Sequence, residues 1–289
     1  MKNPISRILP RFLAAATSLI AFPASAALVY HYPLGGNFDQ VGPGGTPVSP
    51  AITLFGAGSG ATTPNWVEGI APGSTQAIRL GSGTDNTRVS IAANDAWRSV
   101  TGFTVSAWIQ PQANAGTGHS ANSIFWLGTT GGSARFVLQM NDLTDLRAGG
   151  RRTGSESVPF NTDLVAGTNI TGTSNTETDP LTLGQTYHVA ATADYLTGFV
   201  TIYLNGASIA SRQIEAWDPY GSTADEDFVI RLGSNTGGGE VFNGVLDDLR
   251  VYNNALSASE VAALAVPEPS IALLGAIGAI GLVRRRRLA

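Results

Sequence analysis

The stretch that decides the fold is FTVSAWIQ at residues 103–110. Its apolar residues alternate with mostly polar ones, so the two sets face opposite sides of an extended chain. One set consists of Phe103, Val105, Ala107 and Ile109, and the other of Thr104, Ser106 and Trp108. A period of two, carried by β-branched and aromatic residues, predicts a half-buried β-strand.

Similar segments recur between residues 27 and 265, separated by Gly and Asn clusters. The predicted strands are residues 28–34, 76–80, 88–91, 103–110, 123–127, 135–140, 187–194, 198–204, 228–232 and 243–252. Asn205-Gly206 favours a two-residue hairpin turn and hence antiparallel pairing. Residues 147–180, rich in Thr, Gly and Asn, are interpreted as a loop or an extra hairpin.

One short helix is predicted at the end of this region. Ser257 and Glu260 have the spacing of a capping box, in which both side chains satisfy free backbone donors. The pattern predicts a helix over residues 258–264 that closes the sandwich.

The composition sets limits on stability and partners. Without cysteines the chain has neither disulfides nor thiolate metal sites, so its stability must come from core burial. Residues 27–265 carry ten Lys and Arg against twenty Asp and Glu, a net charge of about −10. Such a surface repels nucleic acid and suits divalent cations.

The N-terminus has the pattern of a cleavable signal peptide. A basic start precedes an apolar stretch at residues 12–22 and a small-residue site that ends at Ala26. The apolar stretch is shorter than the roughly 20 residues of a membrane-spanning helix. We therefore expect export and cleavage between Ala26 and Ala27.

The C-terminus resembles a PEP-CTERM sorting signal. Pro267, Glu268 and Pro269 precede an uncharged apolar segment, which ends in the cluster Arg284, Arg285, Arg286 and Arg287. The resemblance implies an apolar sorting helix within residues 266–289, transient insertion in the membrane, and processing by an exosortase. It also implies a Gram-negative host that makes exopolysaccharide, and a place at the cell surface or in the extracellular matrix. An ordinary membrane helix is the alternative.

Three segments together resemble the laminin G-like members of the concanavalin A-like lectin/glucanase superfamily. They are residues 103–111, residues 187–206, and residues 242–257 with the sequence FNGVLDDLRVYNNALS. The opening segment VYHYPLGG at residues 29–36 is similar to the first strand of that family. The resemblance implies an all-β, two-sheet antiparallel jelly-roll sandwich over residues 27–265.

Asp247 is the candidate metal ligand. Alternation along residues 244–252 places it with Leu249 and Val251 on the core-facing side, where a carboxylate needs a partner. Calcium is one solution, because it binds carboxylate and carbonyl oxygens. Family members often hold calcium at the rim of the sandwich. The resemblance implies that Asp247 is a calcium ligand, with Asp39 as a second ligand. The alternative is that Asp247 accepts hydrogen bonds from a loop backbone or pairs with an arginine.

Aromatic side chains are the candidate carbohydrate contacts, because a ring can stack on a sugar. Trp108 is expected to line the concave sheet, and the further candidates are Trp126, Trp217 and Tyr220. Packing in the core or in loops is the alternative for each of them, because aromatics dominate burial energetics.

The sequence offers little for catalysis. The Glu-x-Asp-x-Glu strand of glucanases in the superfamily is missing, and adjacent carboxylates such as Asp247 and Asp248 point to opposite faces of a strand. We therefore expect an exported, non-catalytic module that binds carbohydrate such as exopolysaccharide. A structural or adhesive matrix protein with protein partners is one alternative, and a glycan-active enzyme is the other.

Overall fold

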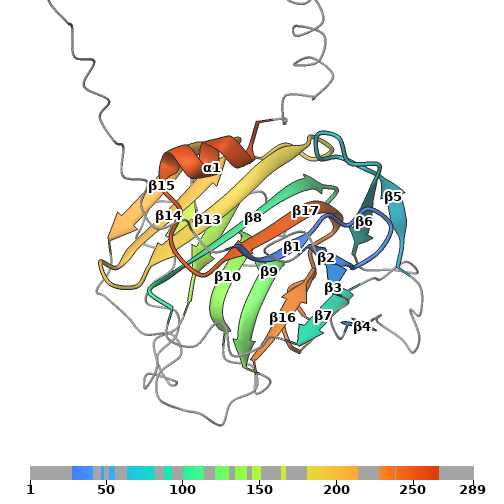
Figure 1. Cartoon of the computed structure of the whole chain (residues 1–289), viewed down its shortest axis with the longest axis horizontal. Helices are drawn as coiled ribbons and strands as arrows, with labels where there is room; N and C mark the ends of the chain where they lie inside the picture. Colours follow the sequence, from blue (N-terminus) through green and yellow to red (C-terminus); the bar gives the residue numbers. More distant parts are fainter. Residues whose placement is uncertain are drawn as a thin grey trace, which may run out of the picture.

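The computed structural model of the chain is shown in Figure 1. It describes residues 28–41, 47–48, 52–55, 64–81, 88–92, 100–113, 121–129, 134–141, 145–150, 164–166, 181–213, 228–237 and 239–266. The predicted signal peptide, residues 267–289 of the predicted sorting tail, Trp217 and Tyr220 lie outside these residues.

The described residues form two large antiparallel sheets, which lie face to face (Figure 1). The eight-stranded sheet has the order β15 (Ala207–Gln213), β14 (Phe199–Leu204), β13 (Tyr187–Asp194), β8 (Gly102–Pro111), β17 (Gly244–Tyr252), β6 (Gln76–Leu80) and β5 (Trp66–Glu68). Its eighth strand, β1 (Leu28–Tyr32), also pairs with β17. The strand β17 therefore pairs with β8 along one edge and with β1 and β6 along the other.

The seven-stranded sheet supplies the second layer. Its order is β12 (Leu164–Ala166), β11 (Asp145–Gly149), β10 (Ala134–Asn141), β9 (Ala121–Thr129), β16 (Phe228–Leu232), β7 (Arg88–Ala92) and β4 (Ile52–Phe55). Two short strands, β2 (Gln40–Val41) and β3 (Pro47–Val48), form a separate pair. This architecture confirms the predicted two-sheet jelly-roll sandwich.

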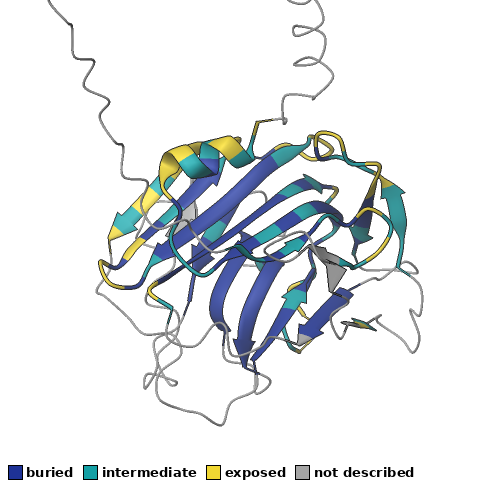
Figure 2. Ribbon diagram, viewed as in Figure 1, coloured by how far each residue is buried: buried dark blue, intermediate teal, exposed yellow. Residues whose placement is uncertain are grey.

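The core lies between the two sheets, and Figure 2 shows the central strands as buried. In β8 the apolar set of the alternating pattern is fully buried, as predicted. The ring of Phe103 lies 5.8 Å from that of Phe125 and 4.6 Å from that of Phe136, centroid to centroid, and so links the two layers. Burial of apolar area at about 25 cal/mol per Å² makes this interface the main source of stability.

Helix α1 (Ala258–Leu264) covers part of the outer face of the eight-stranded sheet (Figure 1). The capping box is present as predicted, because Ser257 accepts from the Glu260 backbone and Glu260 accepts from the Ser257 backbone. Val261 of the helix packs with Ala190, Tyr203 and Tyr252 of the sheet.

All ten predicted strands match observed ones to within two residues at each end, and β6, β13 and β16 match fully. The Asn205-Gly206 turn joins β14 to β15 with φ values of 50° and 81°. The strand β15 itself was not predicted, because six of its seven residues are small or polar and no apolar face alternates along it. Residues 147–180 contribute to the pair of β11 and β12, so the extra-hairpin interpretation is correct there.

Candidate functional site

A β-bulge in β17 sets the geometry of the candidate site. Asp247 lies opposite Trp108 on β8, whereas Arg250 lies opposite Ser106, so β17 holds one more residue than β8 over this interval. Asp248 takes up the extra residue with a φ of 47°, a backbone conformation that L-residues seldom adopt. The predicted alternation is therefore wrong here: Asp247 shares a face with Trp108, while Leu249 and Val251 face the core.

Asp247 is nevertheless fully buried, because the loop of residues 69–75 covers it. Its Oδ2 accepts hydrogen bonds from the backbone N–H groups of Ile70 and Ala71, both at 2.9 Å. Its Oδ1 accepts from the Ser74 hydroxyl at 3.1 Å and from the Asp248 N–H at 2.8 Å. Burial raises the pKa of Asp247, and these four donors act in the opposite direction. Asp247 thus anchors the loop, as in the loop-backbone alternative.

Asp39 has a different environment. Its carboxylate accepts from the side-chain amide of Asn37 at 2.8 Å, and its backbone N–H donates to the same side chain. No group of three or more His, Cys, Asp and Glu side chains that could hold a metal ion occurs within the described residues. The donors around Asp247 point positive hydrogens at both of its oxygens, which does not fit a cation. Calcium binding by Asp247 and Asp39 stays a prediction.

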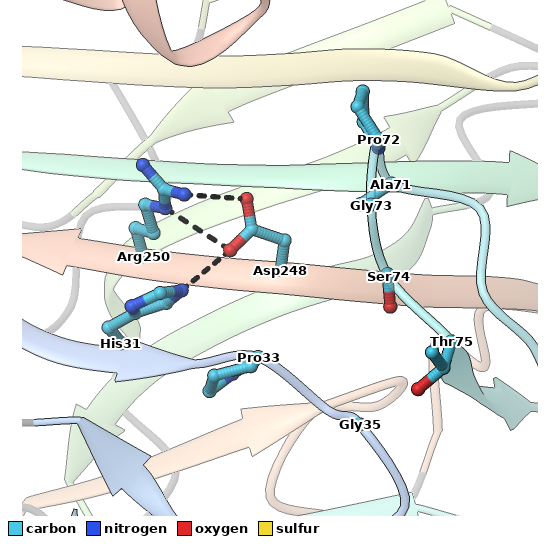
Figure 3. Close-up of a pocket in the computed structure, with 10 residues that line it drawn as sticks. All are labelled: His31, Pro33, Gly35, Ala71, Pro72, Gly73, Ser74, Thr75, Asp248 and Arg250. Carbon is cyan, nitrogen blue, oxygen red and sulfur yellow. Dashed lines mark hydrogen bonds and ion pairs between the residues drawn. The ribbon is translucent and has the colours of Figure 1, made fainter. Parts of the chain in front are cut away.

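Asp248 is the centre of a charged cluster on the outer face of the eight-stranded sheet (Figure 3). Its Oδ1 lies 2.6 Å from Nε2 of His31 and accepts from Nε of Arg250 at 3.2 Å. Its Oδ2 lies 3.0 Å from a terminal nitrogen of Arg250. Burial alone would lower the pKa of Arg250, but Asp248 and, to a smaller extent, Tyr252 together outweigh burial and raise it. These contacts hold Asp248 and Arg250 in place.

This cluster lines a cleft of about 690 Å³. The opposite wall is the loop that Asp247 anchors, at residues 71–75, and Pro33 and Gly35 complete the lining (Figure 3). A Cβ atom added at Gly35 or Gly73 would meet nothing within 4 Å, so the backbone is open to a ligand at both glycines. The volume is in the range of small-molecule sites, about 300 to 1,000 Å³.

His188 and Trp108 lie beside each other on the same sheet face. Nε2 of His188 is 2.8 Å from the Ser106 hydroxyl, while Nδ1 is buried without a hydrogen-bond partner. Burial lowers the pKa of His188 to about 4, so the ring is neutral at neutral pH. Trp108 is partly exposed, and its ring meets His188 edge-on at 5.5 Å. Trp108 lies opposite Asp247 in the pairing of β8 with β17, one residue from Asp248, but it does not line the cleft.

Trp126 has another place in the fold. It lies on β9 in a small cluster with Ala134, Val137 and Val229, and 3% of it is exposed. This cluster belongs to the seven-stranded sheet, so the structure does not bring Trp126 and Trp108 together. Trp126 is therefore a packing residue in this structure, as in the packing alternative.

Sequence reasoning missed His31, Asp248 and Arg250 as a site. The segment DDLR at residues 247–250 offered a signal, because alternation alone places Asp248 and Arg250 on one face, away from Leu249 and Val251. His31 lies 217 residues away from Asp248 in the chain, and only the pairing of β1 with β17 brings the two together.

Solved structures with the same architecture confirm the fold. One of them is the fourth domain of AbnA, an extracellular GH43 arabinanase from Geobacillus stearothermophilus, solved in complex with arabinotriose. It matches with a TM-score of 0.54 at 22% identity, and the alignment covers 83% of this chain and 99% of that domain. The binding domain of botulinum neurotoxin DC in complex with SialylT has a TM-score of 0.54 at 13% identity, with 83% of this chain and 50% of that one covered. The binding domain of Paraclostridial Mosquitocidal Protein 1 has a TM-score of 0.55 at 16% identity, with 83% and 52% covered. The chain thus spans about half the length of these two binding domains.

Two further findings complete the comparison. A search of curated proteins finds no match. Within the described residues, no helix has both the length and the apolar character needed to cross a membrane.

A family model agrees with the fold. The model described as the concanavalin A-like lectin/glucanases superfamily, of the laminin G type, matches residues 80–262. This range holds most strands of both sheets and most of helix α1. The chain therefore belongs to the concanavalin A-like lectin/glucanase superfamily.

Proposed function

We propose that this protein is an exported, non-catalytic module that binds carbohydrate in the cleft of His31, Asp248 and Arg250. The observation that carries the proposal is the fixed Asp248–Arg250 pair in an open cleft of about 690 Å³. A carboxylate and a guanidinium side by side offer acceptors and donors to neighbouring sugar hydroxyls. Because each already holds the other in place, little side-chain entropy is lost when a ligand binds.

The cleft favours binding over hydrolysis. Among the described residues that line it, Asp248 is the single carboxyl group, and it is paired with a histidine and an arginine. Glycoside hydrolysis needs two carboxyl groups across the bond to be cleaved. Relatives in fold that were solved with arabinotriose or with SialylT make carbohydrate a reasonable ligand class. Exopolysaccharide of the cell envelope or biofilm is the proposed ligand.

Export is the second part of the proposal. Residues 1–26 would be the signal peptide and residues 266–289 the PEP-CTERM tail, which an exosortase would process after transient membrane insertion. The first described strand begins at Leu28, one residue after the proposed cleavage site, and α1 ends at Leu264. These bounds are compatible with a mature domain of residues 27–265. Its proposed place is the cell surface or the extracellular matrix of a Gram-negative bacterium.

A glycan array with the purified full chain tests the binding part. We expect hits with wild type, and Arg250→Gln should weaken binding of the best hit about tenfold or more, since it removes charge-assisted donors. Arg212→Gln on β15, at the far edge of the same sheet, is the matched control and should bind like wild type. Equal binding by the Arg250 variant, or release of reducing ends from the glycan by wild type, would contradict the proposal.

A further inference from the structure

A second depression lies on the outer face of the eight-stranded sheet, beside helix α1. We call it the α1 groove; it has a volume of about 390 Å³. The residues that line it are Thr192, Asp194, Phe199, Thr201, Tyr203, Asn254, Ala255, Leu256, Ser257, Ala258 and Glu260. None of them lines the His31 cleft, so the two sites are separate.

The groove is rich in hydrogen-bond acceptors. Both hydrogen bonds to the Asp194 side chain, from the N–H groups of Leu196 and Thr197, go to Oδ1, which leaves Oδ2 available. Both hydrogen bonds to the Glu260 carboxylate come from Ser257 and go to Oε2, which leaves Oε1 available. Oδ1 of Asn254 is buried without a hydrogen-bond partner. The carboxylates of Asp194 and Glu260 therefore each have an acceptor oxygen that a ligand can use.

The charge of the groove is negative. Two carboxylates are among its lining residues, whereas the described residues that line it include no lysine, arginine or histidine. The hydrogen bonds from Ser257 lower the pKa of Glu260, which keeps its carboxylate ionised at neutral pH. An anionic ligand would be repelled here, and a ligand with a positive charge and several donors would be favoured.

An exposed aromatic ring completes the groove. Phe199 is 45% exposed although it is a large apolar residue in a strand, and Tyr203 lies in the same lining with its ring buried. A cation over an aromatic face is attracted by the negative potential of the ring. An aromatic face also stacks on the apolar face of a sugar ring. Both properties suit a ligand that combines a sugar ring with an ammonium group.

We infer that the α1 groove is a second ligand site, which takes a sugar unit with a protonated amino group. An ammonium group has three donors and no acceptor, which matches the available carboxylate oxygens of Asp194 and Glu260. The ring of Phe199 would hold the face of the sugar. The inference rests on the proposed carbohydrate function and adds the ligand class: a polysaccharide that contains deacetylated amino sugars.

The test is calorimetric titration of the full chain at about pH 6, where amines of this kind are protonated. The two probes are the trimer of glucosamine and the trimer of N-acetylglucosamine, which differ in the charge on nitrogen. We expect the glucosamine trimer to bind about tenfold more tightly or better, since acetylation removes the charged donors. Equal affinity for the two trimers would overturn the inference.

Variants locate the binding. Glu260→Gln and Asp194→Asn keep the side-chain size and should each weaken binding of the glucosamine trimer several-fold, and Phe199→Ala should do the same. Glu68→Gln is the matched control, because this exposed carboxylate lies on β5 at the opposite edge of the sheet. Thermal unfolding shows whether each variant is folded. Unchanged affinity in all three groove variants would overturn the inference.

The two proposals fail in different ways. Arg250→Gln should leave the affinity for the glucosamine trimer unchanged, because Arg250 lines only the His31 cleft. If array glycans bind and depend on Arg250 while the amino-sugar trimer does not bind, the groove inference alone is wrong. If the trimer binds through Glu260 while no glycan depends on Arg250, the assignment of the His31 cleft is wrong and the groove stands.

Discussion

Asp247 and Asp248 are neighbours in β17, yet their carboxylates serve different parts of the molecule. Asp247 accepts hydrogen bonds from Ile70, Ala71 and Ser74 of the loop of residues 69–75, whereas Asp248 binds His31 and Arg250 on the open sheet face. The bulge between them makes this division possible. One aspartate therefore builds the wall of the cleft, and the other provides its charged floor.

Replacement of Asp247 tests its role as an anchor. Asp247→Ala leaves the Ile70 and Ala71 N–H groups without their acceptor, and should lower the free energy of unfolding by about 2 to 4 kcal/mol. Urea unfolding measures the loss. Glu68→Ala, which removes an exposed carboxylate from β5, should stay within about 0.5 kcal/mol of wild type. A rise of the melting temperature with calcium that disappears in Asp247→Ala would restore the metal interpretation.

Acid should destabilise the protein through His188. Its pKa in the folded state is about 4, below the ordinary value of 6.5, so the unfolded chain takes up a proton before the folded one does. The contribution of neutral His188 to the free energy of unfolding is therefore fully present above pH 6.5. It is lost as the pH drops towards 4, by an amount on the order of 3 kcal/mol.

The measurement is urea unfolding at several pH values between 7 and about 4. His188→Gln keeps a polar group near Ser106 but cannot titrate, so its stability should fall less steeply with acid than that of wild type. If the free energy of unfolding falls with acid equally steeply in the two proteins, the pKa of His188 is not lowered in the folded state. Because other carboxyl groups titrate in both proteins, the difference between the slopes is the quantity to compare.

The helix cap contributes to stability in a measurable way. Ser257→Ala removes the hydroxyl that accepts from the Glu260 N–H and should cost about 1 kcal/mol in denaturant unfolding. Ser259→Ala, two residues later in the first turn of α1, is the control and should cost less. The same loss in both variants would argue against the cap as the cause.

The hairpin turn next to α1 requires glycine. Gly206 has a φ of 81°, and a Cβ there would lie 3.0 Å from the Cα of Ala262 and from the Cβ of Ala265 in and after the helix. Gly206→Ala should therefore lower stability by about 1 to 2 kcal/mol, through strain and through displacement of the helix. Gly237→Ala, where a Cβ would meet only the Asn235 side chain at 3.5 Å, should change the melting temperature little.

Much of the fold could be predicted from local pattern. The strands around Phe103, Tyr187 and Phe228 carry strong alternation, and the cap at Ser257 places α1 without any tertiary information. The strand β15 could not be found in this way, because its edge position leaves it mostly exposed and removes the need for an apolar face. Alternation is informative only where one face of a strand is buried.

The candidate site was harder to predict than the fold. Alternation along β17 places Asp248 and Arg250 together on the face away from Leu249 and Val251. The bulge that turns Asp247 to this same face depends on the pairing of β17 with β8, which no count of residues along one strand reveals. The burial of Asp247 was foreseen, but its cause was not, because the covering loop is 173 to 177 residues away in sequence. The α1 groove likewise joins Asp194 and Glu260 only through tertiary packing.

The most direct test of the account is hydrogen exchange of the full chain, followed by mass spectrometry, with and without a saturating concentration of the best array glycan. We predict slower exchange in residues 31–35 and 71–75, which form the walls of the His31 cleft, and little change in β9 and β10 of the other sheet. Protection confined to the seven-stranded sheet around Trp126, with none in the cleft, would contradict the central claim.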